Sequence, residues 1–178
     1  VVAWAWVASL LTREAVLVAL VPVALRLPWF LFALPAGVIT DRADRRRLIL
    51  WMDAARGLAF AGAALVIWAA LPLVPAPADG VSDPTLFLLI CGAALAVGAA
   101  EVFRDNAAQT MLPSMVPHAA LERANGRLWS VELVANALIG PVLGAFLIAA
   151  ALPLPFALNA AAYAGAVLLV LGIAGSFR

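Results

Sequence analysis

Five apolar runs of membrane-spanning length dominate this sequence. About 20 apolar residues in a helix cross the hydrocarbon core of a bilayer, and an open sheet cannot satisfy its backbone groups in lipid. Hydrophobic residues make up 66% of the chain and charged residues 12%, whereas a soluble domain has about 25% charged residues. The predicted fold class is therefore an all-α, polytopic transmembrane helical bundle. Its expected spans are residues 15–39, 48–73, 85–104, 128–151 and 154–176.

A shorter apolar segment, residues 1–11, precedes these runs. Eleven residues are too few to cross the hydrocarbon core. The chain begins with Val1 and lacks the basic segment that opens a signal peptide. We therefore expect residues 1–11 to be the remnant of a truncated first helix, and residues 1–178 to be a partial N-terminal transmembrane domain.

The basic residues of the connections predict how the chain crosses the membrane. Four arginines lie within residues 40–47, and the longer connection 105–127 carries Arg123 and Arg127. Cytoplasmic loops hold the excess of basic residues in membrane proteins, so loops 40–47 and 105–127 are expected to be cytoplasmic. The other connections are expected to be external: residues 12–14, 72–84 and 152–153.

The cytoplasmic connection 105–127 is polar enough to leave the lipid. Pro113 and Pro117 are expected to break it, and residues 119–125 are expected to form a short surface helix. The whole pattern predicts a multi-pass protein of the cell membrane (inner or plasma membrane), with the lipid bilayer as its surroundings.

Several classes of function need residues that this sequence lacks. A single His118 and a single Cys91 make no metal site, and no glycine-rich phosphate-binding loop is present. No nucleophile is paired with a base in the pattern of an enzyme, so we expect neither catalysis nor a bound cofactor. The run of arginines is too short and too close to lipid to bind nucleic acid.

The loop between the first two full spans carries six of the 21 charged residues of the chain. Gly37, Asp41 and Arg45 are spaced by four residues, so they share one face if the preceding helix continues through the loop. Positive charge at the membrane exit explains the arginines alone, because acidic residues contribute little to orientation. The aspartates Asp41 and Asp44 therefore indicate a further role, and Gly37 would let a neighbouring helix approach closely.

The segment Gly37-x-x-x-Asp41-Arg42-x-x-Arg45-Arg46 resembles the loop between the second and third helices of major facilitator superfamily transporters. The form Asp-Arg-x-Asp-Arg-Arg-Arg is similar to the branch that contains siderophore and macrolide-type exporters. Asp44 stands where that family usually has glycine. The resemblance implies that Asp41 caps a helix in the other half of the transporter. It also implies that Arg45 pairs with an acid at the cytoplasmic end of the fourth helix.

Two acids are available for that pair, Glu101 and Asp105, which are one helical turn apart at the end of span 85–104. Asp105 is the preferred partner of Arg45, because it lies closer to the aqueous boundary. Glu101 lies deeper and is expected to titrate or to hold an arginine. The alternative for Glu101 is a partly hydrated acid at a helix end.

The fifth helix contains Gly140-Pro141-x-x-Gly144. Glycines spaced by four residues favour close helix packing, and proline bends a helix. The motif resembles the antiporter signature of the fifth helix in exporters of the same superfamily, with Asn136 and Ala145 at two of its glycine positions. Gly140, Pro141 and Gly144 are therefore expected to form a hinge and packing seam. Generic membrane-helix packing is the alternative.

Three polar residues inside the spans are candidates for a substrate pathway: Arg26, Asn136 and Asn159. A charge at the depth of Arg26 usually faces a partner or a watery cavity, and its partner could equally be an acid outside this sequence. Asn159 could instead make a hydrogen bond between helices.

The resemblance implies one six-helix half, with its first helix truncated, of a twelve-helix transporter that works by alternating access. The expected function is export of small organic molecules of the drug or siderophore type, with proton antiport. The expected partners are the substrate, protons and the C-terminal half. Asp41, Arg42, Arg45 and Asp105 would form a cytoplasmic latch of the outward-facing state. The alternative is a non-transporting membrane scaffold or assembly subunit.

Overall fold

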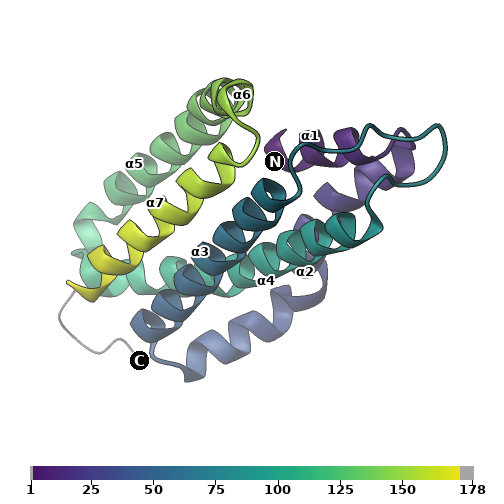
Figure 1. Cartoon of the computed structure of the whole chain (residues 1–178). Helices are drawn as coiled ribbons and strands as arrows, with labels where there is room; N and C mark the ends of the chain where they lie inside the picture. Colours follow the sequence, from purple (N-terminus) through teal and green to yellow (C-terminus); the bar gives the residue numbers. More distant parts are fainter. Residues whose placement is uncertain (1, 173–178) are drawn as a thin grey trace.

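The computed structural model describes residues 2–172, apart from the side chains of Ser114 and Met115. Within this range the chain forms helices joined mostly by short connections (Figure 1). They are α1 (Val2–Leu11), α2 (Ala15–Arg42), α3 (Arg45–Ala69), α4 (Pro84–Met115), the 3-10 turn η1 (His118–Ala120), α5 (Leu121–Val134), the π-helical segment η2 (Ala135–Ile139), α6 (Gly140–Ala150) and α7 (Leu154–Leu171).

Five of the described helical stretches are long and apolar enough to cross a membrane. They are α2, α3, α4, α7 and the continuous stretch His118–Ala150, which runs from η1 through α6. The predicted all-α, polytopic helical bundle is confirmed. The last predicted span, 154–176, ends in residues outside the described range.

The helix bounds differ from the prediction mainly after residue 104. Helix α4 does not end at residue 104 but continues to Met115. Residues 119–125 do not form a separate surface helix but belong to the long stretch His118–Ala150. Ala107 and Met111 are buried one turn apart against Ile49 of α3, so packing holds this polar segment in a helix. Pro113 lies in the last turn of α4, where its missing N–H disturbs little of the helix.

Helices α2 and α3 are separated by only two residues, Ala43 and Asp44. The Asp44 carboxylate accepts a hydrogen bond from the backbone N–H of Arg47 at 3.1 Å. This is the N-cap interaction that satisfies an otherwise free donor in the first turn of a helix. Asp83 caps α4 in the same way, through the N–H of Leu86 at 2.9 Å. One of the two unexplained aspartates of the loop therefore begins a helix.

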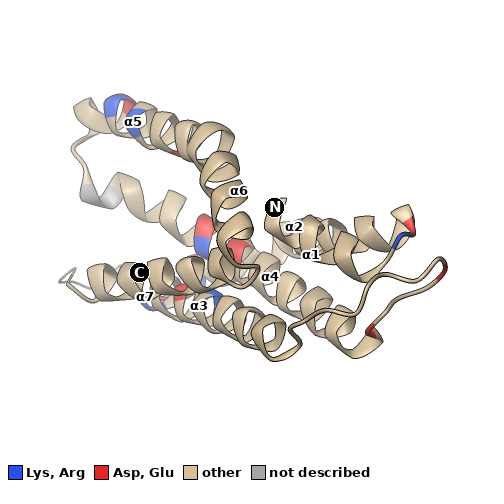
Figure 2. Ribbon diagram, turned by 45° about the horizontal axis from the view of Figure 1, so that its top comes forward, with Lys and Arg blue, Asp and Glu red and all other residues tan. Residues whose placement is uncertain are grey.

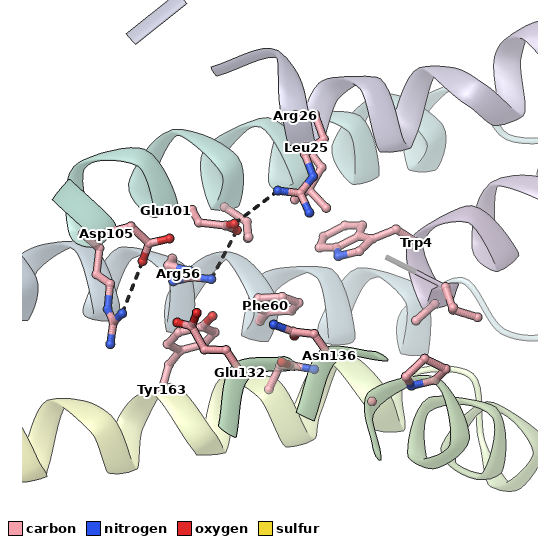
Figure 3. A pocket seen from close by; sticks show the side chains of 17 residues that line it. Trp4, Leu25, Arg26, Arg56, Phe60, Glu101, Asp105, Glu132, Asn136 and Tyr163 are labelled. Atoms are coloured by element: carbon pink, nitrogen blue, oxygen red, sulfur yellow. Dashed lines mark hydrogen bonds and ion pairs between the residues drawn. The ribbon is translucent and has the colours of Figure 1, made fainter. Parts of the chain in front are cut away.

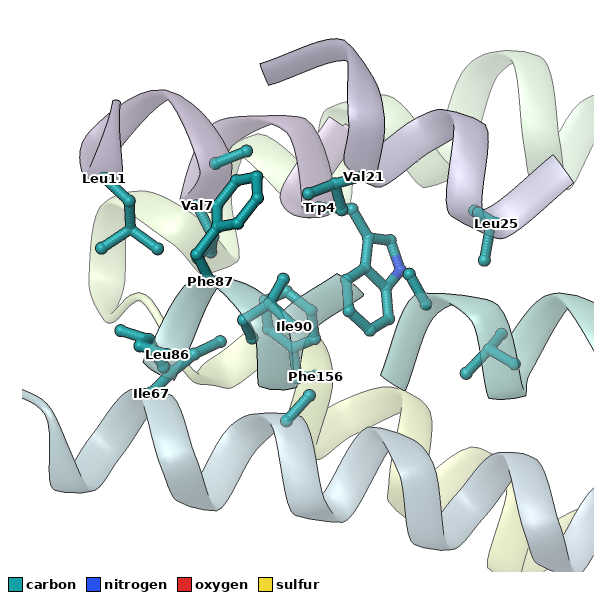
Figure 4. Close-up of a cluster of buried hydrophobic side chains, with 14 of the residues drawn as sticks. Trp4, Val7, Leu11, Val21, Leu25, Ile67, Leu86, Phe87, Ile90 and Phe156 are labelled. Carbon is teal, nitrogen blue, oxygen red and sulfur yellow. The ribbon is translucent and has the colours of Figure 1, made fainter. Parts of the chain in front are cut away.

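The principal packing contacts are those of α4 with α2 and α3, and of α3 with α7. The apolar core lies where α1 meets these helices (Figure 4). Trp4 of α1 is 3% exposed and packs edge-on against Phe156 of α7, with 4.8 Å between ring centroids. Helix α1 is too short to be counted among the spans, yet four of its residues are buried in this core. The buried members of this core are Trp4, Val7, Ala8, Leu11, Val21, Leu25, Phe60, Ala63, Ile67, Leu86, Phe87, Ile90, Ala94, Val97 and Phe156.

The connections gather at the two ends of α3. At one end, the Thr12 hydroxyl donates to the carbonyl of Gly80 at 2.7 Å, and the N–H of Ser82 donates to the carbonyl of Leu11 at 2.9 Å. At the other end, the Arg46 guanidinium donates to the carbonyls of Val170 and Leu171 at the end of α7. Two of the connections predicted to be external therefore lie together, and the arginine-rich loop lies at the opposite end of α3.

Gly98 of α4 allows α2 and α4 to cross closely. A Cβ atom at this position would collide with the backbone carbonyl of Leu25 on α2. Small residues let the backbones of membrane helices approach in this way. Leu25 adjoins Arg26, and Gly98 precedes Glu101 by three residues. The crossing therefore sets how closely these two charged residues meet.

Replacing Gly98 with alanine tests this crossing. Gly98→Ala is expected to destabilise the protein by about 1–3 kcal/mol, because the added methyl group overpacks against backbone that cannot rotate away. The measurement is the Tm of the purified protein in detergent. Gly92→Ala is the matched control on the same helix, since nothing lies within 4 Å of a Cβ there. Equal Tm values for the two variants would contradict the close crossing.

Candidate functional site

A cavity of about 700 Å³ lies between the stretch α5–η2–α6 and the other helices (Figure 3). None of the residues of α5, η2 or α6 is buried, and in Figure 2 α5 stands clear of α3 and α7. This stretch therefore forms a loosely packed wall of the cavity. The polar and aromatic residues that line the cavity are Trp4, Arg26, Arg56, Phe60, Glu101, Arg104, Asp105, Glu132, Asn136, Asn159 and Tyr163.

Glu101 of α4 joins two arginines from different helices. Its Oε1 lies 3.5 Å from Nη1 of Arg26 on α2, and its Oε2 lies 3.4 Å from Nη2 of Arg56 on α3. The Arg56 guanidinium also lies over the ring of Tyr163 on α7, 4.4 Å from the ring centroid. A guanidinium is attracted to the face of an aromatic ring. Glu101 thus connects three spans, and Arg56 connects them to a fourth.

Arg104 forms the centre of a second group of charges. Its Nε lies 3.5 Å from Asp53 of α3, and its Nη1 lies 3.2 Å from the neighbouring Asp105. The Asp53 side chain is 1% exposed, so its ion pair with Arg104 is buried on the side of the carboxylate. Removing one member of such a buried pair leaves an uncompensated charge.

The two groups together contain three arginines and three acids. They are Arg26, Arg56, Arg104, Asp53, Glu101 and Asp105. Figure 2 shows acidic and basic residues meeting on α4 in the middle of the bundle, while most of the ribbon carries neither. Charges in a membrane span are costly unless they are paired or hydrated. The two groups hold equal numbers of arginines and acids, so these charges are paired within the described part of the chain.

The cavity brings together seven of the residues predicted from the sequence. Arg26, Glu101, Asp105, Asn136, Gly140, Pro141 and Asn159 all line it. The Nδ2 of Asn159 donates to the carbonyl of Pro155 one turn back on its own helix at 2.7 Å, and the described residues include no hydrogen bond from it to another helix. Gly144 is not among the lining residues, and neither are the loop residues Gly37, Asp41, Arg42 and Arg45.

The expected pair between Arg45 and Asp105 is not formed. Asp105 pairs with Arg104, its neighbour on the same helix, which supplies a positive charge without any long-range contact. Nε of Arg45 is buried and has no hydrogen-bond partner among the described residues. The next residue, Arg46, makes the long-range contact instead, to the end of α7.

The expected hinge coincides with a change in helix type. Residues 135–139 are π-helical, and the N–H of Gly140 donates to the carbonyl of Ala135. Pro141 has no N–H, and its ring would clash with the carbonyl four residues back in a regular α-helix. The wider π turn relieves this conflict. A Cβ at Gly140 would lie only 2.9 Å from the Ala135 oxygen, so glycine suits this turn.

Among the described residues, no neighbouring helix packs closely at two of the expected glycines. Nothing lies within 4 Å of the position that a Cβ would take at Gly144 or at Gly37. The nearest atoms at Gly140 belong to its own helical stretch. The predicted hinge at Gly140 and Pro141 therefore coincides with the π turn, while the predicted packing seam has no close helix contact among the described residues.

Four charged residues of the site were not candidates from the sequence: Asp53, Arg56, Arg104 and Glu132. Their spacing holds a usable signal. Asp53 and Arg56 are three residues apart in an apolar span, and so are Glu101 and Arg104, which places each pair on one helix face. The acid comes first in both pairs, so two antiparallel neighbouring helices would place each acid opposite an arginine. The partner helix of each could not be inferred from spacing alone.

Replacing Glu101 with glutamine tests the first group of charges. The variant leaves Arg26 and Arg56 without their acid, so the free energy of unfolding is expected to fall by about 2 kcal/mol, between the values for exposed and buried ion pairs. A double-mutant cycle of Glu101→Gln with Arg56→Gln is expected to give a coupling of about 1 kcal/mol or more. A cycle with Arg46→Gln is the control, and coupling of the same size there would contradict the assignment.

The contact between Arg46 and α7 generates a second test. Arg46→Gln removes the guanidinium that satisfies the carbonyls of Val170 and Leu171, so the last turn of α7 is expected to fray. Hydrogen exchange at residues 168–172 is expected to become at least several-fold faster. Arg47→Gln is the matched control, because that side chain is exposed. Equal exchange in both variants would show that Arg46 does not hold α7.

Comparisons with known proteins agree with this architecture. The family model described as transmembrane secretion effector, of the major facilitator superfamily, matches residues 1–174. Comparisons with curated proteins and with solved structures gave no match. The family match covers nearly the whole sequence and includes every helix described above. The chain therefore belongs to the transmembrane secretion effector family of major facilitator transporters.

Proposed function

We propose that this chain forms the substrate-handling half of a secondary active exporter of small organic molecules. The family supports transport and efflux, and it indicates a transporter instead of an enzyme. The observation that carries the proposal is the cavity of about 700 Å³ lined by charged, amide and aromatic side chains. A cavity of this volume fits one small organic molecule.

Alternating access requires that one wall of the cavity move relative to the other. The stretch α5–η2–α6 is suited to be the moving wall, because none of its residues is buried and its π turn precedes Pro141. The other helices share the apolar core around Trp4 and Phe156 and are suited to remain together. We propose that bending at residues 135–141 opens and closes the cavity.

Glu101 is our candidate for coupling to protons. It holds Arg26 and Arg56 together, so a proton on its carboxylate would release both arginines and loosen three helices at once. Proton entry from one side and release to the other would then drive antiport.

The loop residues Asp41, Arg42 and Arg45 are our candidates for a latch between conformations. Nε of Arg45 is buried without a hydrogen-bond partner among the described residues, and an unsatisfied buried donor is unfavourable. We propose that Arg45 finds an acid, with Asp105 the first choice, in the outward-facing state. The loop then lies on the cytoplasmic side of the cell membrane, and the C-terminal half of the transporter covers the cavity.

A transport assay tests the latch. Asp41→Asn and Arg45→Ala are expected to abolish efflux from cells while membrane insertion remains intact, because neither variant can complete the latch. Asp79→Asn is the matched control, since Asp79 lies in the connection at the other end of α3. Normal efflux by both loop variants would refute the latch.

Cysteine labelling tests the pathway and separates a transporter from a membrane scaffold. In a background with Cys91 replaced by alanine, Arg26→Cys and Asn159→Cys are expected to react with a membrane-impermeant thiol reagent, because both positions line the cavity. Phe30→Cys is the control for a lipid-facing position, since Phe30 is 93% exposed on α2. A scaffold would stay unlabelled at all three positions.

A further inference from the structure

Glu132 of α5 is a charged residue that belongs to neither group of ion pairs. Six charged residues line the cavity, and the other five belong to the two groups of ion pairs described above. With the buried Asp53 included, those groups hold three positive and three negative residues. Glu132 makes no ion pair within the described part of the chain, so it gives the cavity one negative charge in excess.

The surroundings of Glu132 are suited to a ligand. Glu132 and Asn136 are one turn apart, and both point into the cavity toward the side that Arg56 and Phe60 form (Figure 3). An isolated carboxylate among membrane helices is costly, and such residues are typically functional. A positively charged ligand would remove this cost. The three arginines of the cavity offer no matching site for an anion, because each already has an acid partner.

An aromatic surface faces the same space. The Phe60 ring lies 5.6 Å from the Trp4 ring and is stacked 5.7 Å from the Tyr163 ring, measured between centroids. All three residues line the cavity. Aromatic faces attract cations and pack against flat apolar groups. One wall of the cavity thus offers an unpaired carboxylate, and the other offers a row of rings.

We propose that Glu132 is a specificity-determining residue that selects organic cations carrying aromatic or bulky apolar groups. The cationic centre would lie near the Glu132 carboxylate, and the apolar groups would pack on Trp4, Phe60 and Tyr163. Asn136 would supply a neutral hydrogen-bonding group one turn along the same helix. This inference rests on the proposed export function, because it assigns the ligand class of the same cavity.

Two probes of equal shape and opposite charge test the proposal: tetraphenylphosphonium and tetraphenylborate. Their binding to the purified full-length protein in lipid nanodiscs would be measured by equilibrium dialysis. Wild-type protein is expected to bind the cation and to bind the anion much more weakly. Glu132→Gln is expected to weaken cation binding by about tenfold or more, since the variant removes the carboxylate that would attract the cationic centre. Glu132→Asp, which keeps the charge, is expected to retain most of the affinity.

Glu122→Gln is the matched control, because Glu122 lies on the same helix but does not line the cavity. Equal cation affinity in Glu132→Gln and wild type would overturn the proposal. Absence of saturable cation binding would also overturn it, as would anion binding of equal strength. The comparison of the two probes on wild-type protein needs no variant, so it tests the ligand class even where Glu132→Gln fails to fold, and Glu132→Asp then tests the residue.

Efflux by wild-type cells separates this proposal from the proposed function. Efflux that is equally fast in Glu132→Gln and wild type, with unchanged probe binding, would remove the role of Glu132 and leave the exporter standing. Cation-selective binding that depends on Glu132, in a protein without efflux of any tested compound, would support the site and count against the exporter.

Discussion

The exclusion of uncompensated charge from the bilayer governs the centre of this structure. Arg56 and Asp53 on α3, with Glu101 and Arg104 on α4, place opposite charges across one helix interface. The close approach of α2 at Gly98 then brings Arg26 to the same acid. Apolar packing alone gives little preference among neighbours in lipid, since the tails are as apolar as leucine. The ion pairs therefore make the arrangement of α2, α3 and α4 specific.

The molecule also divides into a firmly packed part and a loosely packed part. The core around Trp4 and Phe156 joins α1, α2, α3, α4 and α7. The stretch α5–η2–α6 contributes nothing to it, and its large apolar side chains, such as Trp129 and Phe146, are exposed. Apolar exposure of this kind is compatible with lipid but gives little tertiary stability. Motion between the two parts consequently costs less than motion within the core.

Sequence reasoning was strongest where length and hydropathy decide the outcome. The spans, the all-α class and the family all followed from apolar runs and from the loop around Asp41. It was weaker at helix ends, because tertiary contacts of Ala107 and Met111 extend α4 through a polar segment. It selected Arg26 and Asn136 as site residues from their polarity in apolar runs, and Glu101 from the acid that the family resemblance requires at the end of the fourth helix. It paired Arg45 with Asp105 and overlooked Arg104. Arg104 is the neighbour of Asp105 on the same helix and pairs with it, so Asp105 needs no partner from a distant part of the sequence.

The π turn also decides which side chains share the cavity. Pro141 follows Glu132 by nine residues, and in a regular α-helix nine steps of about 100° would place them on opposite faces. The π turn accommodates one extra residue, which reduces the offset to that of about eight steps, or roughly 80°. Both residues line the cavity as a result. Residues 135–139 thus act as a phase correction between α5 and α6: deleting one residue there would restore a regular helix with the two faces still aligned, whereas inserting one more would rotate the face of α6 by about 100° and out of the site.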